Sequence, residues 1–278
     1  MSGVRELFTV SVDRLDADWG KIVREQFCEY YHKKCFKCRK SEPDISIGVC
    51  SVRHGRDKDV VICPYRLLEN RQIFTDCISL LSNHEIGNEL HIVPEVTIPG
   101  GSVDYFLVSS DSDRKVKDFM GIELQAMDTT GDVWTQRQKA LKELGLIDED
   151  VANKPYGINW KMTAKTILLQ LHHKVKTFEG LNKHLVLVVQ DCLLDYIKRE
   201  FRFDHISDKA RLGDAMHFHV YQLKRDNDDY KLTFSAAYST DTNGVSGLLG
   251  LNADANISYD ALVEQLEGKI SNKTLYMI

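Results

Sequence analysis

The chain has 278 residues, of which 43% are hydrophobic and 28% are charged, and its formal net charge is −5 at pH 7. This length is enough to bury a full core, and the composition is ordinary for a soluble globular protein. The sequence has no run of about 18 apolar residues that would span a bilayer, and the acidic balance excludes a chain coated in basic residues. The N-terminal stretch MSGVRELFTV lacks the basic start and apolar run of a signal peptide, so we expect a cytoplasmic protein.

Cysteines are concentrated near the N-terminus, where five of the seven fall within the first 63 residues. In a reducing compartment, an odd number of cysteines indicates thiols or metal ligands before disulfides. Residues 1–65 have few aliphatic side chains in regular spacing, so we expect a subdomain held together by a metal ion. A C-x-x-C pair and two later cysteines supply four thiolates for a structural zinc or iron ion: Cys35, Cys38, Cys50 and Cys63. Cys28 is the main competitor for a ligand position.

Residues 66–278 form the second predicted unit, and in it the hydrophobic period changes several times. Helical spacing of apolar residues alternates with strand patterns, and Gly100-Gly101 between two such patterns is a strong hairpin signal. The predicted elements, in chain order, are a helix over 65–81, strands over 91–99, 102–110 and 118–128, a helix over 159–176, a buried strand over 183–190, a helix over 193–205 and a hairpin within 216–238.

Two acidic side chains and one amide are predicted to meet on one face of the three-stranded unit. Glu123 and Gln125 are two residues apart on a strand, so their side chains leave the same face, and Asp104 lies near the start of the preceding strand. Single acidic residues on strands are mostly solvated, but a charge inside an apolar strand usually has a partner or a metal ion. Carboxylate oxygens suit Mg²⁺, which would activate a water molecule and bind a phosphate oxygen, with Gln125 orienting the water or holding the phosphate.

The hairpin register adds a further acidic residue. If Gly100 and Gly101 occupy the centre of the turn, position 97 pairs with 104 and position 95 with 106. Directly opposed residues point the same way, so Glu95 would share a face with Asp104.

Four segments carry a resemblance to a known family: ICPYRLLENRQIF (62–74), IPGGSVDYFLV (98–108), DFMGIELQAMDTTG (118–131) and INWKMTAKTILLQL (158–171). They resemble the NotI family of type II restriction endonucleases, a branch of the PD-(D/E)XK nuclease superfamily in which the last motif residue is Gln. The similarity spans roughly residues 28–190, and E-x-Q followed by D-T-T-G is its most specific part.

This resemblance implies an α/β fold with a PD-(D/E)XK core, a mixed β-sheet flanked by helices, beside a four-cysteine metal subdomain. It implies Mg²⁺-dependent hydrolysis of DNA at a specific duplex sequence. Asp104, Glu123 and Gln125 match the catalytic motif, and an upstream Glu of the family pattern is matched to Glu95, with Glu89 as the alternative. Val103 replaces the Pro of the usual Pro-Asp pair.

Cleavage of both DNA strands requires two active sites and this chain carries one motif, so we expect a dimer, with C-terminal elements serving DNA recognition and dimerisation. The partner is an identical chain or a homologous second subunit, as in heterodimeric enzymes such as BbvCI, whose subunits the modest length resembles. Two other functions fit the pattern less well: a structure-selective repair or recombination nuclease, and a non-catalytic DNA-binding zinc protein. Lys161 either reaches a phosphate or lies on a solvated helix face.

Overall fold

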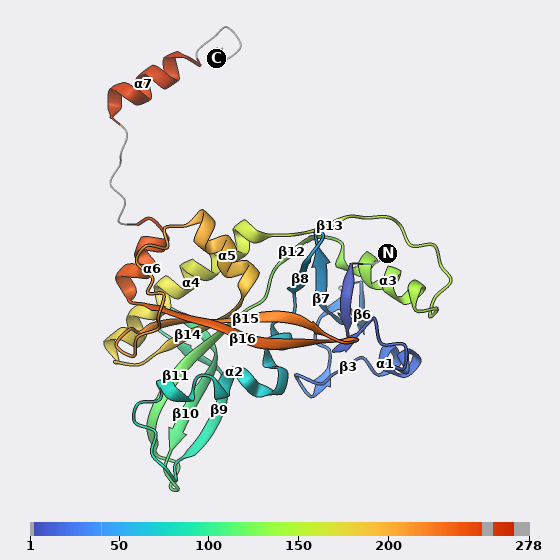
Figure 1. Ribbon diagram of the computed structural model, residues 1–278, viewed down its shortest axis with the longest axis horizontal. Helices are drawn as coiled ribbons and strands as arrows, with labels where there is room; N and C mark the ends of the chain where they lie inside the picture. Colours follow the sequence, from blue (N-terminus) through green and yellow to red (C-terminus); the bar gives the residue numbers. More distant parts are fainter. Residues whose placement is uncertain (1–2, 40, 252–257, 270–278) are drawn as a thin grey trace.

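The computed structural model describes residues 3–39, 41–251 and 258–269 (Figure 1). Its largest element is a six-stranded mixed sheet in the order β16-β15-β14-β11-β10-β9. β9, β10 and β11 form an antiparallel meander, β14 and β15 run parallel to β11, and β16 returns antiparallel to β15. The strand bounds are β9 (Glu89–Ile98), β10 (Gly101–Ser110), β11 (Val116–Gln125), β14 (Leu185–Gln190), β15 (Met216–Asp226) and β16 (Asp229–Thr240).

Helical segments cover both faces of this sheet. α4, α5 and α6 pack on one face, and η1, α2 and η2 pack on the other (Figure 1). The helical bounds are η1 (Pro64–Arg71), α2 (Gln72–Thr75), η2 (Ile78–Leu80), α4 (Trp160–Gly180), α5 (Asp191–Glu200) and α6 (Thr242–Leu248). Because both faces are covered, all six residues of β14 are buried, as the continuous apolar run at 183–190 predicted.

The N-terminal part of the chain forms a second, four-stranded sheet in the order β2-β1-β7-β8. Its core side chains, such as Leu7 and Val52, belong to the same buried cluster as Leu171 of α4, and a buried ion pair of Arg66 with Glu6, 2.7 Å long, joins η1 to β1. The remaining bounds are β1 (Val4–Leu7), β2 (Val10–Ser11), α1 (Trp19–Glu25), β3 (Phe27–Cys28), β4 (Lys33–Lys34), β5 (Cys38–Arg39), β6 (Glu42–Ser46), β7 (Val49–His54), β8 (Lys58–Val61), β12 (Thr129–Gly131), α3 (Val133–Glu143), β13 (Tyr156–Ile158) and α7 (Tyr259–Glu267).

The predicted helix over 65–81 was wrong as a continuous element. Its apolar residues are buried as expected, but the backbone leaves helical angles at Glu69 and Asn70, so the segment divides into η1, α2 and η2. The Glu69 carboxylate accepts a hydrogen bond from the Leu232 amide at 2.6 Å and pairs with Arg66 at 2.9 Å. The tertiary contact from β16 and the local pair within η1 fix the break, which apolar spacing does not reveal.

The hairpin turn also lies one residue earlier than predicted. Ile98 pairs with Gly101, so Pro99 and Gly100 form its centre, and position 97 pairs with 102 instead of 104. Gly100 has φ +102, and a Cβ there would lie 2.4 Å from the carbonyl oxygen of His173. Close packing of α4 therefore determines where the hairpin turn lies. Thr177 strengthens this contact by donating to the Pro99 carbonyl at 3.0 Å.

Within the described ranges, every helix is too short or too polar to cross a membrane.

Candidate active site

Asp104 and Glu123 lie opposite one another on adjacent antiparallel strands. The pair Tyr105–Ile122 sets the register of β10 with β11, so the next positions along the ladder are Asp104 and Glu123. Asp104 is half-buried and its Oδ2 accepts a hydrogen bond from the Leu124 amide at 2.8 Å, whereas Glu123 is 4% exposed. The two carboxylates therefore share the sheet face that packs against α4.

Burial and a neighbouring carboxylate make each of the two acidic groups hard to ionise. Burial raises the pKa of Glu123 to about 7, and the neighbouring Asp104 adds to the rise. Burial also raises the pKa of Asp104, while the Leu124 amide and Lys174 act in the opposite direction. A group of acidic side chains with raised pKa values in one place is typical of a functional site, because a bound cation would remove the cost of ionising them.

Lys174 is the member of this site that the sequence analysis missed. It extends from α4, is 4% exposed, and its Nζ donates to Glu123 Oε1 at 2.6 Å and to the Ser102 carbonyl at 2.5 Å. The sequence did carry a signal, because Lys174 falls at helical spacing between the apolar positions Leu171 and Phe178. A lysine on the apolar face of a helix is seldom buried without a partner.

The structure brings Glu95 to Asp104 despite the shifted turn. Val96 pairs with Val103 and Pro94 with Tyr105, so Glu95 stands across from Asp104 and contributes to its raised pKa. Glu95 is exposed and has a left-handed backbone, with φ 53°. Glu89, the alternative, lies at the far end of β9 and pairs with His91 at 3.3 Å.

Gln125 lies at the end of β11, two residues after Glu123, and is half-buried. Its Nε2 donates to the neighbouring Ala126 carbonyl at 2.5 Å. The amide carries no charge, so Lys174 is the one cation, within the part of the chain that the structure describes, that lowers the pKa of both Asp104 and Glu123. Lys161, by contrast, is an exposed residue at the start of α4.

The cysteines form a cluster whose membership differs in one place from the predicted set. A cavity of about 10 Å³ is lined by Cys28, Cys35, Cys50 and Cys63. Cys38 is exposed and its Sγ lies 3.8 Å from the hydroxyl of Ser46. Burial raises the pKa of the Cys28, Cys35 and Cys50 thiols, and proximity to Cys63 adds to each rise.

Neither site has the geometry of a preformed metal centre. Within the described ranges, no group of three or more His, Cys, Asp or Glu side chains is arranged to hold a metal ion. The donor chemistry nevertheless fits in both places, with carboxylate oxygens for a hard cation at Asp104 and Glu123 and sulfurs for a softer ion at the cysteines.

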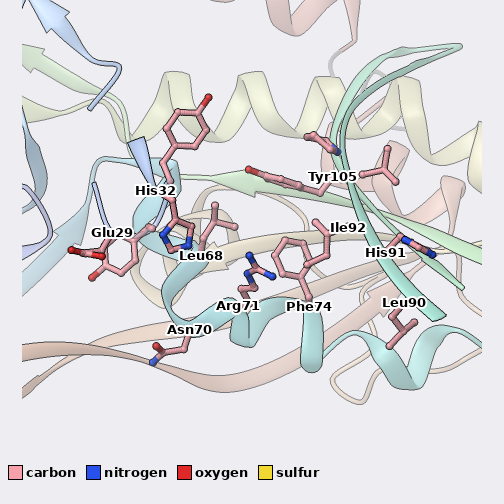
Figure 2. Close-up of a pocket in the computed structure, with 14 residues that line it drawn as sticks. Glu29, His32, Leu68, Asn70, Arg71, Phe74, Leu90, His91, Ile92 and Tyr105 are labelled. Carbon is pink, nitrogen blue, oxygen red and sulfur yellow. The ribbon is translucent and has the colours of Figure 1, made fainter. Parts of the chain in front are cut away.

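An open pocket of about 890 Å³ lies on the other side of β10, where Tyr105 points away from the carboxylate face (Figure 2). Its walls come from the N-terminal segment, from η1 and α2, and from the edge strand β9. Figure 2 shows Arg71 in the middle of the pocket, between His32 and Phe74. Arg71 is exposed and has φ 55°, an uncommon angle for a residue with a side chain.

Comparison with known families identifies the class of protein as a restriction endonuclease, because residues 21–233 match the family model described as restriction endonuclease NotI. The match covers more than half of the chain, which belongs to the NotI restriction endonuclease family. It is a type II restriction endonuclease, an enzyme that binds double-stranded DNA and hydrolyses it, and such enzymes usually need Mg²⁺. A search of curated proteins found no match.

Proposed function

We propose that the chain hydrolyses DNA phosphodiesters at a specific duplex sequence with Mg²⁺ held by Asp104 and Glu123, and with Glu95 as a third carboxylate. The observation that carries this proposal is the pair of opposed carboxylates, of which Asp104 is half-buried and Glu123 is buried. Burial raises both pKa values, and a neighbouring carboxylate adds to each rise, Glu95 for Asp104 and Asp104 for Glu123. Such a pair is costly to keep ionised in the protein alone, and a divalent cation offsets that cost.

The order of elements supports a PD-(D/E)XK core around this pair. An irregular helical segment is followed by the meander β9-β10-β11, the long helix α4 and the parallel strand β14. This helix, three strands, helix, strand order, with β12, α3 and β13 between β11 and α4, follows the order of elements predicted from the sequence. Asp104 and Glu123 fall on the two strands where that core carries its catalytic motif.

Each residue of the site would have a separate role in catalysis. When bound, the cation activates a water molecule and stabilises the charge that develops on the phosphate. Asp104 and Glu123 hold the cation, and the backbone amide of Leu124 fixes the Asp104 carboxylate. Gln125, at the end of the strand, orients the attacking water or binds a phosphate oxygen once its contact with the Ala126 carbonyl opens.

The pocket beside Tyr105 is the proposed place for flanking DNA backbone. Arg71, His32 and His91 bring positive or protonatable groups to its wall, and Tyr105 is the direct neighbour of Asp104. Basic side chains position a duplex by binding phosphates, independently of base sequence.

A structural zinc or iron ion at the cysteine cluster belongs to the same proposal, within an N-terminal unit of residues 1–65. Cys35, Cys50 and Cys63 are common to the predicted set and to the observed cluster. The family resemblance implies Cys38 as the fourth ligand, whereas Cys28 lines the cavity together with the other three cysteines. Metal analysis of Cys28→Ser and Cys38→Ser decides between them, since the true ligand is the one whose loss removes the ion.

The oligomeric state and the cellular location complete the proposal. One chain carries one carboxylate site, so cleavage of both strands requires a dimer with an identical or homologous subunit. Restriction of DNA takes place in the cytoplasm, where we place the protein.

Digestion of a plasmid of known sequence, with the protein alone and with a homologous subunit, tests the proposed function. We expect discrete fragments in Mg²⁺ and none in EDTA, with ends that define one recognition sequence. Cutting of branched DNA with an intact plasmid left whole would favour a repair nuclease. DNA binding without cleavage under every condition would favour the non-catalytic alternative.

A further inference from the structure

We infer that Lys174 is a positioning residue of the active site, which fixes the Glu123 carboxylate through Oε1 and so leaves Oε2 available to the divalent cation. This inference rests on the proposed function, because it assigns Glu123 a role in binding the cation. Lys174 itself is neither a motif residue nor a ligand. It supplies a positive charge beside Glu123 that the E-x-Q motif, with its neutral Gln125, does not provide.

The first observation is the burial of Lys174. Its side chain is 5% exposed, whereas Lys161, Lys165 and Lys176 of the same helix are exposed. An ammonium group is taken out of water at a cost of several kcal/mol unless it gains a good ion pair and further hydrogen bonds. Lys174 gains both, through Glu123 and the Ser102 carbonyl.

The second observation is the direction of its two hydrogen bonds. Lys174 Nζ bridges the Ser102 carbonyl at the start of β10 and Glu123 Oε1 near the end of β11. It therefore holds together the two strands that carry the acidic pair. No other hydrogen bond to the Glu123 carboxylate is made by the described residues, so Lys174 determines which oxygen is engaged.

The third observation is the glycine turn that allows this contact. A Cβ on Gly100 would overlap the His173 carbonyl, and one on Gly101 would lie 3.4 Å from Lys174 Cε. The missing side chain at Gly100 thus lets α4 approach the hairpin closely enough for a lysine to reach Glu123.

Binding of a short duplex containing the recognition sequence, titrated with Ca²⁺, tests the inference without relying on cleavage. We expect Lys174→Met to raise the Ca²⁺ concentration needed for half-maximal DNA binding by about 10- to 100-fold, as loss of a contact to a metal ligand does. Lys176→Met, an exposed lysine two residues away, is the matched control and should behave as the wild type. Lys174→Arg, which keeps the charge and the donors, should recover part of the loss.

The double variant Lys174→Met with Glu123→Gln guards against misfolding, because removing both members of a buried pair is often neutral for stability. In a Glu123→Gln background, Lys174→Met should leave the Ca²⁺ dependence unchanged, since it acts through Glu123. An unchanged Ca²⁺ dependence of Lys174→Met alone, or an equal loss in both backgrounds, overturns the inference. Failure of the wild type to cut DNA in Mg²⁺ would instead overturn the proposed function.

Discussion

Replacing Glu123 by Gln should stabilise the metal-free enzyme. In the folded protein, burial and Asp104 raise the pKa of Glu123 from its ordinary value of 4.5 to about 7, even with Lys174 beside it. This difference corresponds to about 3 kcal/mol of folding free energy lost when the side chain is ionised in both the folded and unfolded states. Gln has nearly the same shape and no charge, and its Oε1 can still accept the hydrogen bond of Lys174. Because the buried ammonium loses its anionic partner, Glu123→Gln should recover only part of this amount at pH 8.

The pH dependence follows from the direction of the pKa change. Because the folded-state pKa is raised, the ionisation cost is absent below pH 4.5, grows between pH 4.5 and 7, and is complete above pH 7. Urea unfolding in EDTA should therefore show an advantage for Glu123→Gln that is at most about 3 kcal/mol at pH 8 and falls to at most about 1 kcal/mol at pH 5.5. Saturating Mg²⁺ should stabilise the wild type more than the variant.

Asp118 provides the matched control on the same strand. It is 2% exposed and pairs with Lys183 at 2.6 Å, and its pKa is lowered because this lysine and the Asn83 and Phe119 amides outweigh burial. Asp118→Asn should therefore destabilise the protein, the opposite sign to Glu123→Gln. If Glu123→Gln also destabilised the metal-free protein at pH 8, Glu123 would be an ordinary ion-pair partner and the reasoning would be refuted.

Three further substitutions test other parts of the structure. Gly100→Ala should lower the free energy of unfolding in urea by more than about 1 kcal/mol, because the added Cβ would collide with α4. Gly55→Ala, also at positive φ but in open space, should show only the cost of placing a side chain at positive φ. Equal effects of the two substitutions would contradict the role of helix packing at the turn. Cys63→Ser should lose bound zinc or iron in metal analysis, while Cys77→Ser, a buried thiol outside the cluster, should keep it. Arg71→Ala should weaken DNA binding in Ca²⁺ and reduce its salt dependence by about one released ion, and an unchanged salt slope would remove Arg71 from the interface.

Hydrophobic period and turn signals predicted most of the large sheet. The strands found at 89–98, 101–110 and 116–125 each begin one or two residues before the predicted ones, because period-two alternation marks the buried face more sharply than the ends. The break after Glu69 escaped prediction, since the amide that bonds its carboxylate is in Leu232, far along the chain. Local pattern carries no information about such contacts.

Part of the candidate site could likewise be predicted from the sequence. The i, i+2 relation of Glu123 and Gln125 and the position of Asp104 after a glycine turn follow from strand geometry alone. Lys174 lies 51 residues beyond Glu123 and reaches it only because α4 packs against the hairpin. The grouping of Cys28 with Cys35 likewise depends on how the short strands β3 to β6 fold, which the C-x-x-C spacing does not determine.

Single-turnover cleavage of a duplex containing the recognition sequence, by the wild type and Asp104→Asn, tests the central claim most directly. Asn keeps an oxygen that can accept the hydrogen bond of the Leu124 amide, so the fold should persist while the charge is lost. The account predicts that Asp104→Asn binds the duplex but cleaves it more than about 100-fold more slowly in Mg²⁺, since even indirect contacts to a metal ligand contribute 10- to 100-fold. Cleavage by Asp104→Asn at the wild-type rate and with wild-type Mg²⁺ dependence would contradict it.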